Sequence, residues 1–98
     1  MKEFENKVAV VTGGSAGIGR ATALAFAEKG AKVAIASIQA VEGEETVQLI
    51  RETGGEAIFI QTDVTKAVEV ENFIDQTIAA FGRLDYAFNN AGVMSKMD

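Results

Sequence analysis

The sequence predicts a single α/β domain over residues 1–98, in which helices lie on both faces of a four-stranded parallel sheet. Two observations predict this fold class. Short β-branched apolar runs alternate with longer segments of helical periodicity, and glycines separate the two kinds of segment. The order is therefore βαβαβαβ, and right-handed crossovers between such units give a parallel sheet. We expect the strand order 3-2-1-4, with about three helices.

Each predicted strand is a short apolar run, and each predicted helix carries apolar residues at helical spacing and ends near a glycine. The strands are Lys7–Thr12, Lys32–Ser37, Glu56–Gln61 and Leu84–Asn89. The first helix runs from a glycine-rich turn to Gly30, and its recurring residues are Ile18, Ala21, Thr22, Ala25 and Phe26. The other helices are Val41–Thr53 and Lys66–Phe81. We expect the first two helices on one face of the sheet and the third on the other.

Three glycines, Gly13, Gly17 and Gly19, join the first strand to the first helix. The N-terminus of a helix presents unpaired N–H groups and the positive end of the helix dipole, so it favours a phosphate. Glycines let the backbone approach such a group closely, and the hydroxyl of Ser15 can add a donor. The alternative is a glycine-rich turn that binds nothing. A Walker-type phosphate loop is excluded, because no Lys-Ser/Thr pair follows the glycines.

Three motifs together resemble the short-chain dehydrogenase/reductase family. They are TGGSAGIG at residues 12–19, TDVT at residues 62–65 after the third strand, and NNAG at residues 89–92 after the fourth. The resemblance covers essentially the whole chain. It implies a Rossmann-like fold, here truncated to its N-terminal half, and an oxidoreductase that transfers hydride between a nicotinamide and a carbonyl or alcohol carbon. The implied cofactor is NAD or NADP.

The resemblance also assigns cofactor-binding roles to single residues. Asp63 would accept a hydrogen bond from the adenine amino group, beside the backbone of Val64. The diphosphate would lie against Gly13, Ser15, Gly17, Ile18 and Gly19, and the nicotinamide side against Asn90, Ala91 and Gly92. Asn89 would mainly brace the neighbouring strands by hydrogen bonds from its side chain to backbone groups. From the residues alone, Asp63 is also a helix N-cap in a strand-to-helix turn, and both roles are compatible.

The end of the second strand leaves the choice between NAD and NADP open. An acidic residue there normally binds the ribose hydroxyls and marks NAD, but this chain has Ser37 followed by Ile38. Serine can bond a hydroxyl and does not repel a phosphate. No arginine stands at position 16 or 38 to hold the 2′-phosphate of NADP. An equal alternative is that Ser37 only ends the strand and does not recognise the ribose.

No catalytic residue is assigned to this chain. The family's chemistry uses a tyrosine with a lysine four residues later, whereas the one tyrosine, Tyr86, is followed at that spacing by Asn90. Tyr86 is expected to be a packing residue, and Ser95 and Lys96 have no partner tyrosine. The predicted function is therefore the cofactor-binding half of such an oxidoreductase. The alternatives are a non-catalytic, self-associating nucleotide-binding module and a folded fragment without activity. The substrate is unconstrained.

Composition and charge argue against several classes of binding partner. The formal net charge is −5, with acidic and basic residues interspersed, which argues against nucleic acid and anionic membranes. The chain has no cysteine and no histidine, so we expect no metal site and no disulfide, and a cytoplasmic location. The fourth strand is expected to leave an open sheet edge. Open edges pair with other chains, so we predict a homodimer or a higher oligomer.

Overall fold

A computed structural model describes residues 2–13 and 17–90 of the chain. Its four strands are parallel and lie in the order β3-β2-β1-β4. The strands are β1 (Val8–Thr12), β2 (Lys32–Ser37), β3 (Ala57–Gln61) and β4 (Tyr86–Asn89). The helices are α1 (Gly17–Glu28), α2 (Ala40–Glu52) and α3 (Ala67–Phe81). The predicted fold class and strand order are confirmed.

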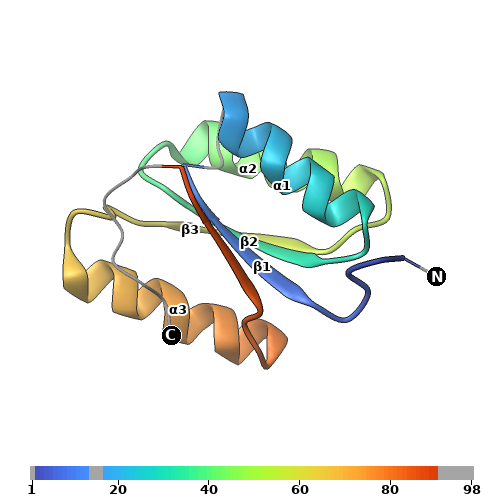
Figure 1. Cartoon of the computed structure of the whole chain (residues 1–98). Helices are drawn as coiled ribbons and strands as arrows, with labels where there is room; N and C mark the ends of the chain where they lie inside the picture. Colours follow the sequence, from blue (N-terminus) through green and yellow to red (C-terminus); the bar gives the residue numbers. More distant parts are fainter. Residues whose placement is uncertain (1, 14–16, 91–98) are drawn as a thin grey trace.

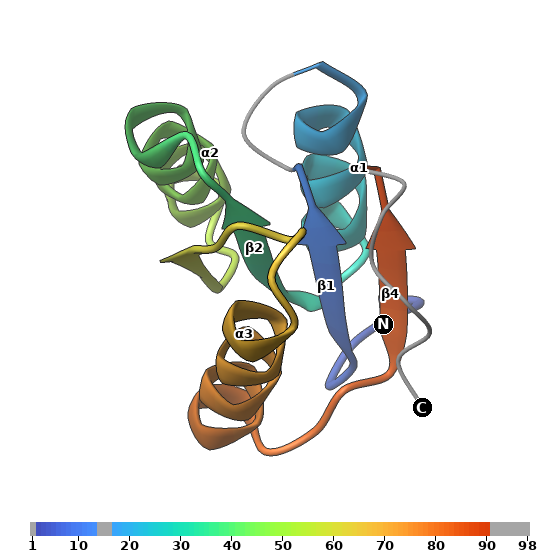
Figure 2. The same cartoon turned by 90° about the vertical axis from the view of Figure 1, so that its left-hand side faces the viewer.

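The helices form two outer layers around the sheet. α1 and α2 cover one face and α3 covers the other, as predicted (Figures 1 and 2). Adjacent residues of β1 therefore enter different cores. Val11 packs with the α1 and α2 side chains, and Val10 packs with Phe73 of α3. Both valines are fully buried, which explains the continuous apolar pattern of this strand.

The buried face of α1 differs from the stripe that the sequence suggested. Gly19, Ala23 and Ala27 are buried, whereas Ile18 is 70% exposed. The three buried residues recur every four positions, so they lie on one face of the helix. Small side chains let α1 lie close to the sheet. The larger Leu24 and Phe26 pack at the side of this core and are only partly buried.

The strand β4 is held at its start by aromatic and polar contacts. The ring of Tyr86 lies 5.1 Å from that of Phe4 and 5.9 Å from that of Phe26, measured between centroids. Tyr86 is therefore an inter-element packing residue, as expected, although its side chain stays 37% exposed. Asp85 accepts the N–H of Val8 at 2.9 Å, which joins the start of β4 to the start of β1.

The four strands end together at one edge of the sheet, which we call the carboxyl edge. Thr12 of β1 is in register with Ala36 of β2 and with Asn89 of β4. Ser37 is in register with Gln61, the last residue of β3. Ligands of open α/β sheets bind outside this edge, so the turns that leave it are the place to look for a site. Within the described ranges, no helix is both long and apolar enough to cross a bilayer.

Candidate functional site

The turn from β1 to α1 uses two glycines in the left-handed region. Gly13 has φ +68° and Gly17 has φ +60°. The N–H of Gly13 continues the sheet by donating to Ala36 O at 2.8 Å. Within the described residues, a Cβ added to Gly17 would meet no atom within 4 Å other than its chain neighbours and the backbone of its own helix. Gly17 is therefore required by backbone conformation and leaves open space at the first residue of α1.

The N-terminus of α1 has the charge pattern of an anion site. The first turn of α1 contains no acidic residue, so no carboxylate of that turn opposes an anion there. The first N–H groups of a helix have no intrahelical partners, and the helix dipole is positive at this end. The side chain of Ile18 is 70% exposed beside these groups. A phosphate group bound here would find donors without any rearrangement of the helix.

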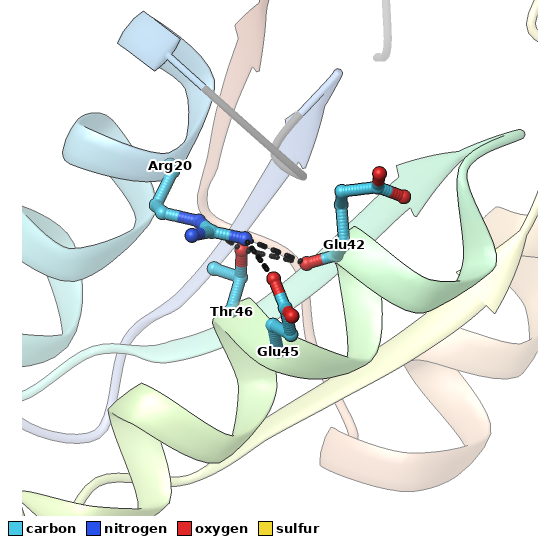
Figure 3. Close-up of polar contacts among 4 residues, drawn as sticks. All are labelled: Arg20, Glu42, Glu45 and Thr46. Atoms are coloured by element: carbon cyan, nitrogen blue, oxygen red, sulfur yellow. Dashed lines mark hydrogen bonds and ion pairs between the residues drawn. The ribbon is translucent and has the colours of Figure 1, made fainter.

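Arg20 fixes this end of α1 against α2. Its Nε donates to Thr46 Oγ1 at 2.9 Å and its Nη2 donates to the carbonyl oxygen of Glu42 at 3.0 Å (Figure 3). The carboxylate of Glu45 lies 3.3 Å from the same Nη2. The guanidinium thus bridges two helices through their facing turns. These contacts hold the start of α1 against α2.

At the end of β2, the predicted ribose-binding residues form a compact turn. Ser37 is 7% exposed, and its Oγ accepts the N–H of Gln39 at 3.0 Å. Ile38 is 64% exposed, and its carbonyl oxygen accepts Gln61 Nε2 at 3.1 Å. The serine hydroxyl therefore organises the approach to α2, while the apolar side chain of Ile38 faces solvent. No acidic or basic side chain stands at either position.

The turn between β3 and α3 holds Asp63 in a defined orientation. Its Oδ1 accepts the hydroxyl of Thr65 at 2.6 Å and the Thr65 N–H at 3.0 Å. These two bonds, with a smaller contribution from the charge of Lys66, hold the pKa of the Asp63 carboxyl below its usual range. The predicted N-cap role is wrong, because the N-cap of α3 is Lys66. Asp63 instead closes an Asx-turn three residues earlier.

The end of β4 lies beside the glycine-rich turn. Thr12 Oγ1 donates to Asn89 Oδ1 at 2.9 Å, so Asn89 braces β4 against β1. This bond is to a side chain, whereas the resemblance implied bonds to backbone groups. The side-chain Nδ2 of the next residue, Asn90, lies 3.5 Å from the carbonyl oxygen of Gly13. The NNAG and TGGSAGIG motifs therefore meet at the carboxyl edge. The predicted site residues Ser15, Ala91 and Gly92 lie outside the described residues.

Two residues that the sequence analysis did not select contribute to this edge. Arg20 holds α1 to α2, and Glu69 of α3 accepts the N–H of Asp63 at 2.7 Å. Glu69 stands at the third helical position, where glutamate often bonds backwards to the preceding turn, so the sequence did contain a signal for it. Arg20 carried no such signal, because its partners are 22 to 26 residues away. Among residues 2–13 and 17–90, no cluster of acidic side chains is suited to a metal ion.

Proteins of similar sequence include an oxidoreductase and a protein named for its likeness to a reductase. The chain is 50% identical over 91 residues to an uncharacterized oxidoreductase of Thermotoga maritima, covering 93% of this chain and 36% of that protein. It is 50% identical over 93 residues to tropinone reductase-like 2 of Erythroxylum coca, covering 95% of this chain and 33% of that protein. The chain therefore spans about a third of the length of these relatives.

Solved structures agree with the fold described above. A short-chain dehydrogenase/reductase of Burkholderia phymatum in complex with NAD superposes with a TM-score of 0.84 at 37% identity, over 89% of this chain and 31% of that one. The apo form of glucose dehydrogenase from Caenorhabditis elegans gives 0.85 at 42% identity, over 90% and 38%. The sequence model of the short chain dehydrogenase family matches residues 7–98. The chain therefore belongs to the short-chain dehydrogenase family.

Proposed function

We propose that this chain binds a nicotinamide dinucleotide, NAD or NADP, across the carboxyl edge of its sheet. One observation carries the proposal: the β1–α1 turn, the TDVT turn and the end of β4 all leave the sheet at this edge. At its centre, α1 begins at a glycine whose missing side chain leaves open space. A bound nicotinamide would supply the hydride chemistry that defines the family. The described residues supply binding and orientation.

In this arrangement the diphosphate lies over the first N–H groups of α1, at Gly17, Ile18 and Gly19. The exposed side chains of Ile18 and Ile38 offer apolar surface to the ligand. The Asp63 carboxylate, kept ionised by its bonds from Thr65, accepts the adenine amino group beside Val64. The phosphate and ribose side of the ligand also contacts Gly13, Ser15 and Ser37, and the nicotinamide side contacts Asn90, Ala91 and Gly92.

The test is calorimetric titration of the 98-residue chain with NAD and, separately, with NADP. The diagnostic variant is Gly17→Ala, and Gly54→Ala is its matched control. Both glycines have positive φ, +60° and +88°. Within the described residues, a Cβ added at either would meet no atom within 4 Å other than its chain neighbours and, for Gly17, the backbone of its own helix. Each alanine therefore carries a similar backbone cost of about 1–2 kcal/mol. Only Gly17 adjoins the proposed diphosphate site.

We expect Gly17→Ala to weaken dinucleotide binding about tenfold or more, because its methyl group occupies the space of the diphosphate. Gly54→Ala should bind as the unchanged chain does. Equal binding by the two variants would show that the diphosphate does not bind at the N-terminus of α1. A chain that binds neither dinucleotide would refute the proposed function as a whole.

We also propose self-association as part of the function, following the alternative of a non-catalytic module. In the described part of the chain, β4 pairs only with β1, so its outer edge lacks a strand partner. Ala87 of β4 is exposed on the α3 side, and no β4 residue joins the core beneath α3. A second copy of the chain would cover this edge. The predicted cytoplasmic location remains part of the proposal.

A further inference from the structure

Glu69 makes a contact that serves the TDVT turn more than its own helix. Its Oε1 accepts the backbone N–H of Asp63 at 2.7 Å, across six residues. A bond of this length to a carboxylate is charge-assisted and stronger than a neutral one. The side chain is only partly exposed. Glu69 is therefore a defined anchor for the main chain at the start of the turn.

The usual purpose of a glutamate at this helical position is to cap its own helix. In that arrangement its carboxylate accepts the N–H of the N-cap residue. Here the N-cap is Lys66, and its N–H donates instead to the carbonyl oxygen of Asp63 at 3.0 Å. Glu69 reaches past Lys66 to Asp63. Its bond therefore fixes the turn that precedes α3.

The contacts of Asp63 leave one of its atoms for a ligand. The N–H is held by Glu69, the carbonyl oxygen by Lys66, and Oδ1 by both groups of Thr65. Within the described residues, Oδ2 has no hydrogen bond from the protein. With its backbone N–H, carbonyl oxygen and Oδ1 all held, the carboxylate has little freedom to turn, so the position of Oδ2 is set by the protein before any ligand arrives.

We propose that Glu69 is a positioning residue for adenine recognition, acting through Asp63. This inference rests on the proposed function, because it requires the adenine amino group to meet the Asp63 carboxylate. Glu69 holds the Asp63 backbone, and Asp63 Oδ2 then accepts a hydrogen bond from that amino group. Hypoxanthine has a carbonyl oxygen in place of the amino group, which an ionised carboxylate repels. Glu69 thereby sets the preference for adenine over hypoxanthine without touching the base.

The experiment measures dissociation constants for NAD and for its deaminated analogue, nicotinamide hypoxanthine dinucleotide. Glu69→Met keeps the length of the side chain and its helix propensity but removes the acceptor. Glu69→Gln keeps an acceptor oxygen without the charge. Glu71→Met is the matched control, because Glu71 is an exposed residue of the same helix. If Glu69→Met does not fold, as judged by circular dichroism, the same two dissociation constants are measured for Glu69→Ala.

We expect the unchanged chain to prefer NAD about tenfold over the analogue, and Glu69→Met to reduce that ratio to about one by losing NAD affinity. Glu69→Gln should show most of the preference for NAD over the analogue, and Glu71→Met should show all of it. A full ratio in Glu69→Met, or equal loss of both ligands, would overturn the inference and leave the proposed function standing. No preference in the unchanged chain would overturn the adenine role of Asp63 as well. No binding of NAD by the unchanged chain would refute the proposed function, and the inference with it.

Discussion

At the scale of single residues, Gly43 shows how one missing side chain brings α2 close to the sheet. A Cβ added at this buried position would overlap the ring of Phe59 on β3. In an exposed helix, glycine to alanine is favourable by about 1 kcal/mol. Overpacking a core costs about 1–3 kcal/mol. At Gly43 this steric cost of an added methyl group should exceed the gain in helix propensity.

We therefore predict that Gly43→Ala lowers the free energy of unfolding by about 1 kcal/mol in urea denaturation. The same change should cost less in a Phe59→Leu background, where the ring is absent. If Gly43→Ala instead stabilised the chain, α2 would have to lie farther from β3 than described here.

The sequence predicted some residues of the site better than others. The turn conformation of Gly13 and Gly17 was predictable, because positive φ at a helix start leaves few other residue types possible. The N-cap assignment for Asp63 failed because aspartate favours both N-caps and Asx-turns, and the two differ only in where the helix begins. The position of Glu69 near the start of its helix was a usable signal. Arg20 gave none, because a long side chain can reach many partners and the sequence does not state which.

At the scale of elements, the α1–α2 contact depends on Arg20. Its hydrogen bonds to Thr46 and to the Glu42 carbonyl are partly buried, whereas the carboxylate partner, Glu45, is 61% exposed. Exposed ion pairs contribute about 0–1 kcal/mol. Hydrogen bonds that involve a charged group contribute about 1.5–3 kcal/mol. The two hydrogen bonds to α2 should therefore outweigh the ion pair.

We predict that Arg20→Ala lowers the free energy of unfolding by about 1.5 kcal/mol or more. Glu45→Ala should change it by less than about 0.5 kcal/mol. Chemical denaturation of both variants at the same ionic strength measures the difference. Equal effects would assign the stabilisation to the ion pair instead.

The elements were predicted to within about two residues at each end, because apolar runs and glycines mark them. The buried face of α1 was not predicted correctly. Apolar periodicity gives weight to large side chains such as Ile18, whereas a helix that packs closely on a sheet buries small ones. Gly19, Ala23 and Ala27 fit that requirement. In α2 and α3, apolar residues at helical spacing mark the buried face better: Val47, Ile50 and Phe73 are buried, although Ile78 is 45% exposed.

At the scale of the whole molecule, Asp85 couples stability to pH. Bonds from the Arg83 guanidinium, and next the N–H of Val8, hold the pKa of the Asp85 carboxyl below its usual range. A carboxyl with a lowered pKa in the folded state stabilises the protein at pH values above its unfolded pKa. That stabilisation is lost as the pH falls through the folded pKa.

We predict that Asp85→Asn destabilises the chain at pH 7, and that its melting temperature approaches that of the unchanged chain as the pH falls through the lowered pKa of Asp85. Thermal melts from pH 7 down to about pH 2, followed by circular dichroism, measure this convergence. A difference that stayed constant over this range would show that the charge of Asp85 does not contribute.

The open edge of β4 gives a prediction about assembly. Charged residues on an edge strand disfavour pairing with another chain. Ala87→Lys should therefore shift the chain toward the monomer, while Ala80→Lys, the same change at an exposed position on α3, should not. Sedimentation velocity over a concentration series measures the mass. A chain that stays monomeric at every concentration would contradict self-association.

The strand order was predictable because alternating βα units and right-handed crossovers leave few topologies. What covers the outer edge of β4 was not predictable, because no strand among residues 2–13 and 17–90 pairs with that edge.

Dinucleotide binding depends most on the N-terminal amides of α1, and amide chemical shifts on titration with NAD test them most directly. We predict large shifts at Gly17, Ile18 and Gly19 and at the Asp63 turn, with little change at Gly54 and Gly55 at the opposite edge of the sheet. Saturating NAD that left the Gly17, Ile18 and Gly19 amides unmoved, or moved those of Gly54 and Gly55 instead, would contradict this prediction.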